Sequence, residues 1–313
     1  MEPMEIPIAL RRPSASYSLK GSLTARRSAV VLPLIFLLLG CVTRAENVHE
    51  ITNVARIEDY HPHWEPLFKG IDLAEGRKVA PDPVAVYAVR IDLKESSIEF
   101  LATPSNGDRP LETDGRKTST FLKEFRCRLA INASPFSPAE EGEGAPKDIL
   151  GLSASRGDVY SQPHSSHCAL LISRNNKVSI AKPPLKTEGV YNAVSGFGML
   201  LEKGQNVGSN DQRHPRTAAG VSKDGRYLFL LLIDGRQPLY SVGTTTQETA
   251  EWMRQIGGYD ALNLDGGGST TLVISDGQGG AQILNSPIHN KIPGTERVNG
   301  NHLGVYAKPL RVK

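Results

Sequence analysis

The stretch NLDGGGSTTLVIS, residues 263–275, places an acid and three glycines between two apolar runs. The apolar runs predict two strands, so Asp265 falls at the rim of a sheet, where the chain turns. Three successive glycines cost backbone entropy and are expected where a ligand must approach the main chain closely. The residues that could hold such a ligand directly follow the acid: Gly266, Gly267, Gly268, Ser269 and Thr270.

A second Asp-Gly pair at the end of a predicted strand lies upstream of Asp265-Gly266, in HPRTAAGVSKDGRYLFLLLIDGR, residues 214–236. Its apolar runs predict two strands joined by a turn around residues 223–226. The second strand ends at Asp234, which places another carboxylate at a sheet rim. Asp-Gly is also ordinary turn chemistry, so a plain turn explains Asp234 on its own at least as well.

The glycine stretch differs from the common nucleotide-binding loops. Glycine amides can form an anion-binding nest. A P-loop, however, carries a Lys and leads into a helix, whereas residues 270–275 predict a strand. The dinucleotide fingerprint GxGxxG is missing as well. The stretch therefore predicts a different cradle for a phosphate or a sugar.

The N-terminus has the features of a targeting segment. Arg26 and Arg27 precede an apolar run, residues 29–39, which is long enough for a signal peptide and short for a membrane span. The run ends in LLGC, and this ending resembles the lipobox of bacterial lipoproteins, in which the Cys is diacylated. We expect residues 1–40 to be a signal peptide and Cys41 to be the lipidation site, which would hold the protein on a membrane surface. An ordinary secretory signal with an incidental Cys is the alternative.

The location follows from this anchor. A lipid-anchored protein without an Asp after the Cys is expected in the outer membrane or at the surface of the bacterial cell envelope, and here Val42 follows Cys41. Residues 41–80, which are polar, are expected to lead from the anchor to the folded domain.

The charge balance argues against nucleic acid as a partner. The whole chain has a formal net charge of +3. Residues 1–40 contain five Lys or Arg and two Asp or Glu, so the rest of the chain is close to neutral. No Lys- or Arg-rich run with interleaved aromatic residues occurs in the sequence, and we expect no nucleic-acid binding.

The remaining pattern predicts an α+β fold with mixed, largely antiparallel sheets and a few flanking helices. We expect one domain, residues 81–313, without internal repeats. Helices are predicted at residues 118–125 and, with a capping box formed by Thr245 and Glu248, at residues 245–258. Residues 137–151 are rich in Gly, Pro and acids and predict an exposed loop. Strands are predicted at residues 83–93, 97–103, 128–132, 168–173, 178–181, 197–202, 227–233 and 261–265, the first two as neighbours.

Two cysteines remain besides Cys41. Cys127 and Cys168 lie beside apolar runs. A disulfide between them and burial as two free thiols are both open.

Several motifs together resemble the phosphodiester glycosidase family, over about residues 80–308. They are HPRTAAG, DGR, SVG, NLDGGGSTT and ERVNGNHLGVY, in this order. One departure concerns an early strand end, where the family has Asn-Gly-Gly-aromatic and this chain has INASPF, with Asn132 and Phe136 kept. The resemblance implies hydrolysis of a sugar-1-phosphodiester at the anomeric carbon, which releases free sugar and a phosphomonoester.

The residue types suit this reaction. Arg presents a planar fork that binds two phosphate oxygens, and the family's PRTA and ER positions assign this role to Arg216 and Arg297. An oxocarbenium-like transition state requires a carboxylate near the anomeric carbon, for which Asp265 and Asp234 are the candidates. Asp265 is the stronger one, because a phosphate leaving group needs little protonation. Further contacts to the sugar or phosphate are assigned to Asn132, Thr217, Gly266, Gly267, Gly268, Ser269 and Asn301.

A metal requirement cannot be read from this sequence. His164 and His167 are spaced i, i+3 at the start of a predicted strand, where a surface pair is expected rather than metal ligands. His214 beside Pro215 could help to bind phosphate, but here too a position without a ligand role is expected rather than a binding role. We expect no cofactor and leave a divalent metal open.

The expected function is therefore that of an envelope-anchored hydrolase acting on a surface glycan or exopolysaccharide. Two alternative functions would use the same predicted binding site for a phosphate or a sugar. One is a non-catalytic lipoprotein that binds phosphosugars, and the other is a metal-dependent phosphodiesterase that cleaves the P–O bond.

Overall fold

The structure is a computed structural model that describes residues 60–139 and 142–310. The predicted signal peptide and Cys41 lie outside the described residues. In the part that is described, no helix is both long and apolar enough to cross a membrane.

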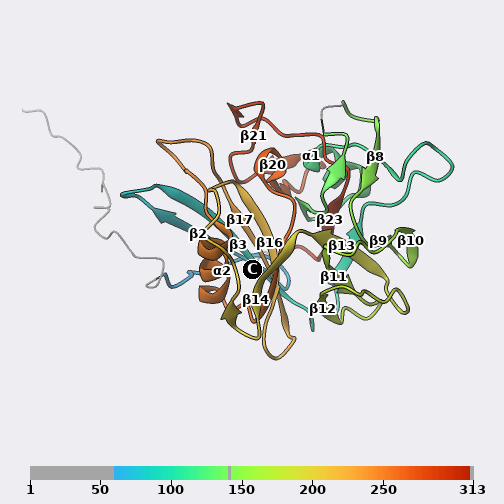
Figure 1. Ribbon diagram of the computed structural model, residues 1–313, viewed down its shortest axis with the longest axis horizontal. Helices are drawn as coiled ribbons and strands as arrows, with labels where there is room; N and C mark the ends of the chain where they lie inside the picture. Colours follow the sequence, from blue (N-terminus) through green and yellow to red (C-terminus); the bar gives the residue numbers. More distant parts are fainter. Residues whose placement is uncertain (1–59, 140–141, 311–313) are drawn as a thin grey trace, which may run out of the picture. The chain divides into compact units, whose positions relative to one another are not determined.

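An eight-stranded sheet forms one side of the domain (Figure 1). All neighbouring strands in it pair antiparallel. Helix α2 (Thr246–Gln255) packs on this sheet against β14, β16, β17 and β18. The strand order is β1 (Glu65–Phe68), β2 (Ile71–Lys78), β3 (Val84–Asp92), β17 (Tyr227–Ile233), β16 (Arg216–Val221), β18 (Asp260–Asn263), β14 (Gly198–Glu202) and β15 (Gln205–Asn206).

Two five-stranded antiparallel sheets complete the main framework. The first has the order β20 (Ala281–Ile283), β19 (Leu272–Ser275), β6 (Leu129–Asn132), β23 (His302–Tyr306) and β4 (Glu99–Ala102), and α1 (Thr118–Phe125) packs against it. The second has the order β10 (Asp158–Ser161), β9 (Ser153–Ser155), β13 (Asn192–Gly196), β11 (Cys168–Ile172) and β12 (Val178–Ala181).

Two small sheets lie outside this framework. One joins β5 (Thr113–Asp114), β8 (Pro146–Ile149) and β7 (Phe136–Ser137), and the other joins β21 (Ile288–His289) and β22 (Ile292–Pro293).

One hydrophobic core joins the three large sheets. Its largest cluster contains Leu230 from β17, Leu129 from β6 and Leu170 from β11, each fully buried. Burial of apolar surface is the main favourable term in folding, so these sheets stabilise each other as one domain. The α+β prediction is confirmed.

The predicted helices and most predicted strands are found at their expected positions. Thr245 caps α2 by accepting a hydrogen bond from the Glu248 amide, and the Glu248 side chain returns to the Thr245 amide, so the capping box is present. Cys127 and Cys168 are both buried and free, which decides the open question of a disulfide.

Three predictions about the chain's organisation need correction. Residues 65–78, which we placed in the lead-in, form β1 and β2 and extend the eight-stranded sheet beyond β3. Residues 137–151 are not simply an exposed loop, because they contain β8, in which Lys147 and Ile149 are buried. Finally, β3 and β4 are not neighbours, since β4 pairs with β23 in another sheet.

Candidate functional site

The Asp-Gly-Gly-Gly corner lies where the eight-stranded sheet passes into the sheet of β19. After β18 ends, the Asp265 amide donates a hydrogen bond to the Ala133 carbonyl (2.9 Å), and the Gly267 amide donates one to the Pro215 carbonyl (2.8 Å). A single 3₁₀ turn, Gly267–Ser269, then leads into β19. The corner is therefore tied to both sheets, which fixes the position of the Asp265 carboxylate.

The three glycines leave space for the Pro215 carbonyl and for the side chains of Arg236 and Arg297. We had expected them to leave space for a ligand at the main chain. A Cβ atom on Gly266 would lie 2.7 Å from the Pro215 carbonyl oxygen. On Gly267, whose φ is +62°, it would lie 3.1 Å from Nη2 of Arg236, and on Gly268 it would lie 3.0 Å from Nη2 of Arg297. The glycines thus allow two guanidinium groups to lie directly against the main chain beside Asp265.

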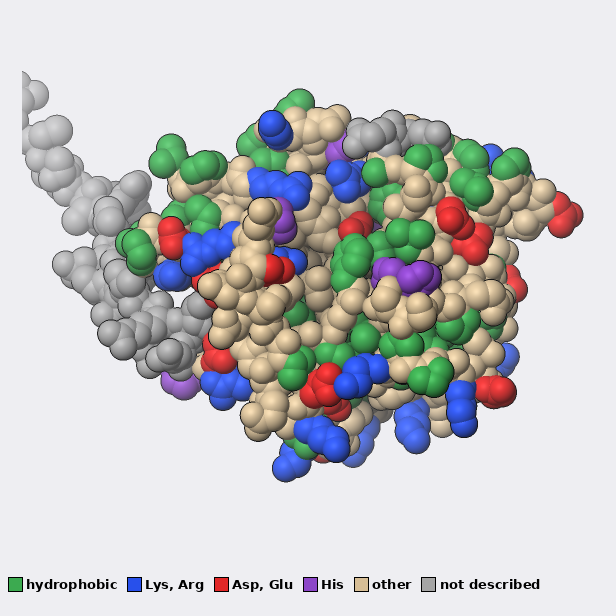
Figure 2. All heavy atoms as spheres, viewed as in Figure 1, with side chains coloured by type: hydrophobic (Ala, Val, Ile, Leu, Met, Phe, Trp, Pro, Cys, Tyr) green, Lys and Arg blue, Asp and Glu red, His purple; other side chains and the backbone are tan. Residues whose placement is uncertain are grey.

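These groups surround a pocket of about 200 Å³. On the face drawn in Figure 2, blue Lys and Arg side chains gather with a purple His side chain above the middle of the surface. Of the described residues that line the pocket, Asp265 is the one carboxylate. The lining residues are Phe197, His214, Pro215, Arg216, Arg236, Asn263, Leu264, Asp265, Gly266, Gly267, Gly268 and Arg297.

Arg236 and Arg297 are available to an anion. Arg297 makes only long contacts of 3.4 Å to Ser269 Oγ and His289 Nδ1, and Arg236 contacts His214 Nδ1 at 3.3 Å. Within the described ranges, no carboxylate oxygen lies within 4.0 Å of either guanidinium. Burial, with Arg297 and Arg216 nearby, lowers the pKa of Arg236. Two unpaired guanidinium groups at one pocket favour a ligand with negative charge.

Asp265 carries a perturbed carboxyl group. Burial raises the pKa of Asp265 to about 6, although the Ser269 hydroxyl and the positive charge of Arg297 both act to lower it. A group with such a pKa is ionised at neutral pH and is still basic enough to accept a proton.

Comparison with known proteins identifies the family of this chain. The family model for phosphodiester glycosidases matches residues 125–306, which contain every residue that lines the pocket. The chain belongs to the phosphodiester glycosidase family. No curated protein matches the sequence.

Solved structures show the same fold. The zebrafish N-acetylglucosamine-1-phosphodiester alpha-N-acetylglucosaminidase catalytic domain, auto-inhibited by its pro-peptide, is 18% identical with a TM-score of 0.58. That match covers 78% of this chain and 85% of the zebrafish domain. A hypothetical protein from Synechocystis is 16% identical with a TM-score of 0.56, and the match covers 77% of this chain but only 62% of that protein. Membership of the phosphodiester glycosidase family supports a hydrolase of the glycosidase type.

Arg216 lines the pocket, but hydrogen bonds within the protein already occupy much of its guanidinium group. Arg216 is 7% exposed. Its Nε donates to the Thr244 carbonyl (2.9 Å), and its Nη2 donates to the Asp211 carboxylate (3.0 Å) and to the Gln212 carbonyl (2.8 Å). We therefore interpret Arg236, and not Arg216, as the residue that binds the phosphate together with Arg297.

The sequence reasoning missed Arg236 as a site residue. It follows Asp234-Gly235, and its φ of +59° places it in the left-handed region. A non-glycine residue in that region is uncommon and can mark a functional position. The motif DGR, residues 234–236, is the signal in the sequence that points to this Arg.

Asn132 and Thr217 lie behind the pocket and position Asp265. Asn132 Nδ2 donates to the Asp265 carbonyl (2.6 Å). Its Oδ1 accepts hydrogen bonds from Thr217 Oγ1 (2.8 Å) and from the Thr271 amide (3.1 Å). Asn132 and Thr217 are buried, and their polar groups are engaged. Through these hydrogen bonds the two side chains support the Asp265 main chain, and neither of them lines the pocket.

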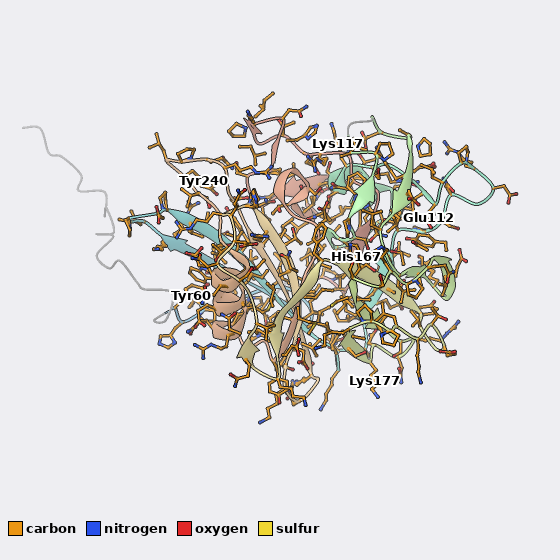
Figure 3. The ribbon with its side chains drawn as sticks, viewed as in Figure 1. Tyr60, Glu112, Lys117, His167, Lys177 and Tyr240 are labelled. Carbon is orange, nitrogen blue, oxygen red and sulfur yellow. The ribbon has the colours of Figure 1, made fainter. Side chains whose placement is uncertain are left out.

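Asp234, the second candidate for the catalytic carboxylate, does not line the pocket either. It is 1% exposed, and burial raises its pKa. It accepts hydrogen bonds from Asn285 Nδ2 (2.8 Å), the Ser286 amide (2.9 Å) and the hydroxyl of Tyr240 (3.1 Å), which Figure 3 labels. Asn285 Nδ2 is also 3.1 Å from the Thr270 carbonyl. Asp234 therefore fixes residues 285–286, and Asn285 in turn contacts the main chain at Thr270.

Asn301 has a similar supporting position. It is fully buried, its Nδ2 donates to the Tyr160 hydroxyl (2.9 Å), and its Oδ1 accepts from the Ser134 amide (3.2 Å). It thereby fixes the turn after Asn132, and it does not line the pocket.

The two residues of the histidine pair do not line the pocket, although the His167 ring lies 5.8 Å from the ring of Phe197, which does. The Nδ1 atoms of His164 and His167 are 2.9 Å apart just before β11, and Figure 3 labels His167. Burial and His164 lower the pKa of His167. No group of three or more His, Cys, Asp or Glu that could hold a metal ion occurs within residues 60–139 and 142–310.

Proposed function

We propose that this phosphodiester glycosidase hydrolyses a sugar-1-phosphodiester at the anomeric carbon. The observation that carries the proposal is a pocket lined by one carboxylate, that of Asp265, and by the guanidinium groups of Arg236 and Arg297, for which no ion pair is found within the described residues. A substrate with a phosphodiester anion joined to an anomeric carbon matches both charges of this pocket.

Arg236 and Arg297 would bind the phosphodiester oxygens. As the bond between C1 and the ester oxygen breaks, the electron pair moves to that oxygen, and the leaving phosphomonoester gains negative charge. The two guanidinium groups stabilise this charge more strongly in the transition state than in the ground state, which is the condition for catalysis.

Asp265 would act on the sugar side of the same bond. Its carboxylate stabilises the positive charge that develops at C1 and accepts one proton from the attacking water, whose oxygen becomes the sugar's anomeric hydroxyl. The products are one free sugar and one phosphomonoester. A single carboxylate is enough, because a phosphate leaving group needs little protonation.

His214 would support the anion site. It contacts Arg236, and burial together with Arg236 lowers its pKa, which favours the neutral imidazole near pH 7. A neutral ring adjacent to Arg236 adds no third full charge to the site.

We further propose that the protein acts on a surface glycan or exopolysaccharide from a lipid anchor at Cys41. This part depends on the sequence pattern LLGC, residues 38–41. Two acyl chains provide stable anchoring without a transmembrane helix.

Product analysis tests the proposed reaction. The purified protein is incubated with methyl phosphodiesters of glucose, galactose, mannose and N-acetylglucosamine 1-phosphates, with and without EDTA or added Mg²⁺ and Mn²⁺. Free sugar and methyl phosphate are expected from at least one substrate, and none from the Asp265→Asn variant. Sugar 1-phosphate and methanol would instead support a phosphodiesterase, and binding without any product would support a phosphosugar-binding protein.

A further inference from the structure

A second hollow adjoins the pocket beside Asp265. It has a volume of about 370 Å³ and is lined by β14, by residues 207–211 and by the start of α2. The two hollows share Phe197, Arg216 and Asn263, so these residues form the border between them. The charged pocket therefore opens towards a neighbouring groove that has its own lining.

Asn263 is a buried amide without a partner. It is 7% exposed, and its Oδ1 is buried without a hydrogen bond. Within the described residues no hydrogen bond donated by its Nδ2 is found either. Leaving a buried polar group unpaired destabilises a protein, so such a group calls for an explanation. The terminal torsion of Asn is broad, and rotation about it turns either end of the amide towards the groove.

Phe197 lies beside this amide and is held there by the main chain. The Phe197 amide donates a hydrogen bond to the Asn263 carbonyl (2.9 Å). A Cβ atom on the preceding Gly196 would lie 2.3 Å from the same carbonyl oxygen, so only glycine permits this approach. Phe197 is 50% exposed, and its ring lies 5.8 Å from the ring of His167, so one part of the aromatic surface stays open to the groove.

The chemistry of these groups assigns the two ends of the substrate. An ionised phosphodiester offers only hydrogen-bond acceptors, and it is matched by Arg236 and Arg297, which only donate. The Asn263 amide offers both a donor and an acceptor, and sugar hydroxyl groups offer the same pair. An exposed aromatic ring suits the apolar face of a sugar ring.

We propose that Asn263 and Phe197 form the sugar subsite, in which Asn263 hydrogen-bonds sugar hydroxyl groups and Phe197 packs on the ring. This assignment rests on the proposed function. It places the sugar at the border of the groove and the phosphate at the arginines, with the anomeric carbon between them at Asp265. It makes Asn263 and Phe197 the residues that determine which sugar is accepted.

The test combines variants of the protein with variants of the sugar. Binding is measured by calorimetry, and hydrolysis by product release, with the four methyl phosphodiesters named above. The best of them is then compared with its monodeoxy analogues. In the wild type, removal of at least one hydroxyl should weaken binding roughly tenfold. Asn263→Ala should weaken binding of the parent by a similar factor and lose this discrimination. If the variant keeps wild-type affinity or still discriminates, the assignment of Asn263 is wrong.

Two further variants control for a purely structural effect. Asn299 has the same kind of buried, unpaired Oδ1 but does not line either hollow. Asn299→Ala should therefore leave the discrimination between parent and deoxy sugars unchanged. Phe197→Ala, at a half-exposed position that does not endanger folding, should weaken binding, whereas Phe197→Trp should preserve it. Equal affinities in both Phe197 variants would overturn the subsite even if Asn263→Ala fails to fold.

The outcomes separate this inference from the proposed function. Hydrolysis that is insensitive to Asn263 and Phe197 would refute the subsite and leave the function standing. Binding that depends on both residues, without hydrolysis, would refute the function and leave the subsite standing. A wild type that neither binds nor hydrolyses any of the four compounds would refute both.

Discussion

Replacing Asp265 with Asn removes the pocket's carboxylate and keeps the size of the side chain. Burial raises the pKa of this carboxyl from 3.8 to about 6 in the folded protein. The folded state therefore binds the proton more tightly than the unfolded state does. Below the unfolded pKa both states are protonated, and the carboxyl costs nothing. As the pH rises through both values, the wild type loses stability relative to a variant that does not ionise.

The magnitude follows from the size of the shift. A difference of about 2 pKa units corresponds to about 3 kcal/mol, since each unit is worth about 1.4 kcal/mol. Linkage distributes this over pH, so that about 1 kcal/mol is present at pH 4.5 and the full amount at pH 8. We expect Asp265→Asn to be more stable than the wild type by these amounts, while its turnover is abolished.

Urea unfolding at pH 4.5 and pH 8 measures the stability difference, and product release measures turnover. Asp148→Asn is the matched control, because Asp148 is an exposed carboxylate outside the pocket. The wild-type kcat/KM should also rise with pH through about 6, because the ionised form of Asp265 is the active one. A stability difference that does not change with pH, or wild-type turnover in Asp265→Asn, would show that the carboxylate is not the perturbed catalytic group.

Three further predictions concern the arginines, the glycines and the anchor. Arg236→Ala and Arg297→Ala should each lower kcat/KM by the equivalent of about 2–4 kcal/mol, with incomplete rescue by Lys; near-normal kinetics in both Ala variants would remove their phosphate role. Gly268→Ala, whose Cβ would lie 3.0 Å from Nη2 of Arg297, should displace this guanidinium and lower kcat/KM at least tenfold without unfolding the protein. Gly142→Ala, where a Cβ meets open space, is its control, and equal kinetics in the two variants would count against the role of Gly268. Cys41→Ser should release the processed protein from the membrane fraction; a processed variant, verified by mass, that stays on the membrane would refute lipidation.

Local patterns in the sequence were sufficient for most of the elements. The capping box of Thr245 and Glu248 predicted α2 because both hydrogen bonds form within one turn of the chain. The apolar run of residues 227–233 predicted β17 because every second residue packs into one layer of the core and the others into another. The Asp265 corner was found because acid, glycines and hydroxyls are adjacent in sequence.

Pairings between distant segments could not be obtained in this way. Whether β4 pairs with β3 or with β23 depends on how whole sheets pack, and nothing in residues 97–103 encodes the choice. The hydrogen-bond partners of Asn132 and Asp234 could not be predicted from the sequence for the same reason. Each is a polar residue at a strand end, and only the tertiary contacts reveal that their polar groups are taken by Asp265's own backbone and by Asn285.

The position of the cleaved bond is the central claim, and hydrolysis in ¹⁸O-labelled water tests it most directly. Free sugar alone does not decide the matter, because it also forms when water attacks phosphorus and the sugar's C1–O bond survives. Mass spectrometry of both products locates the label. Attack at the anomeric carbon beside Asp265 places ¹⁸O in the free sugar and none in the phosphomonoester, which is the result that we predict. Label in the phosphomonoester would contradict it and would make the protein a phosphodiesterase.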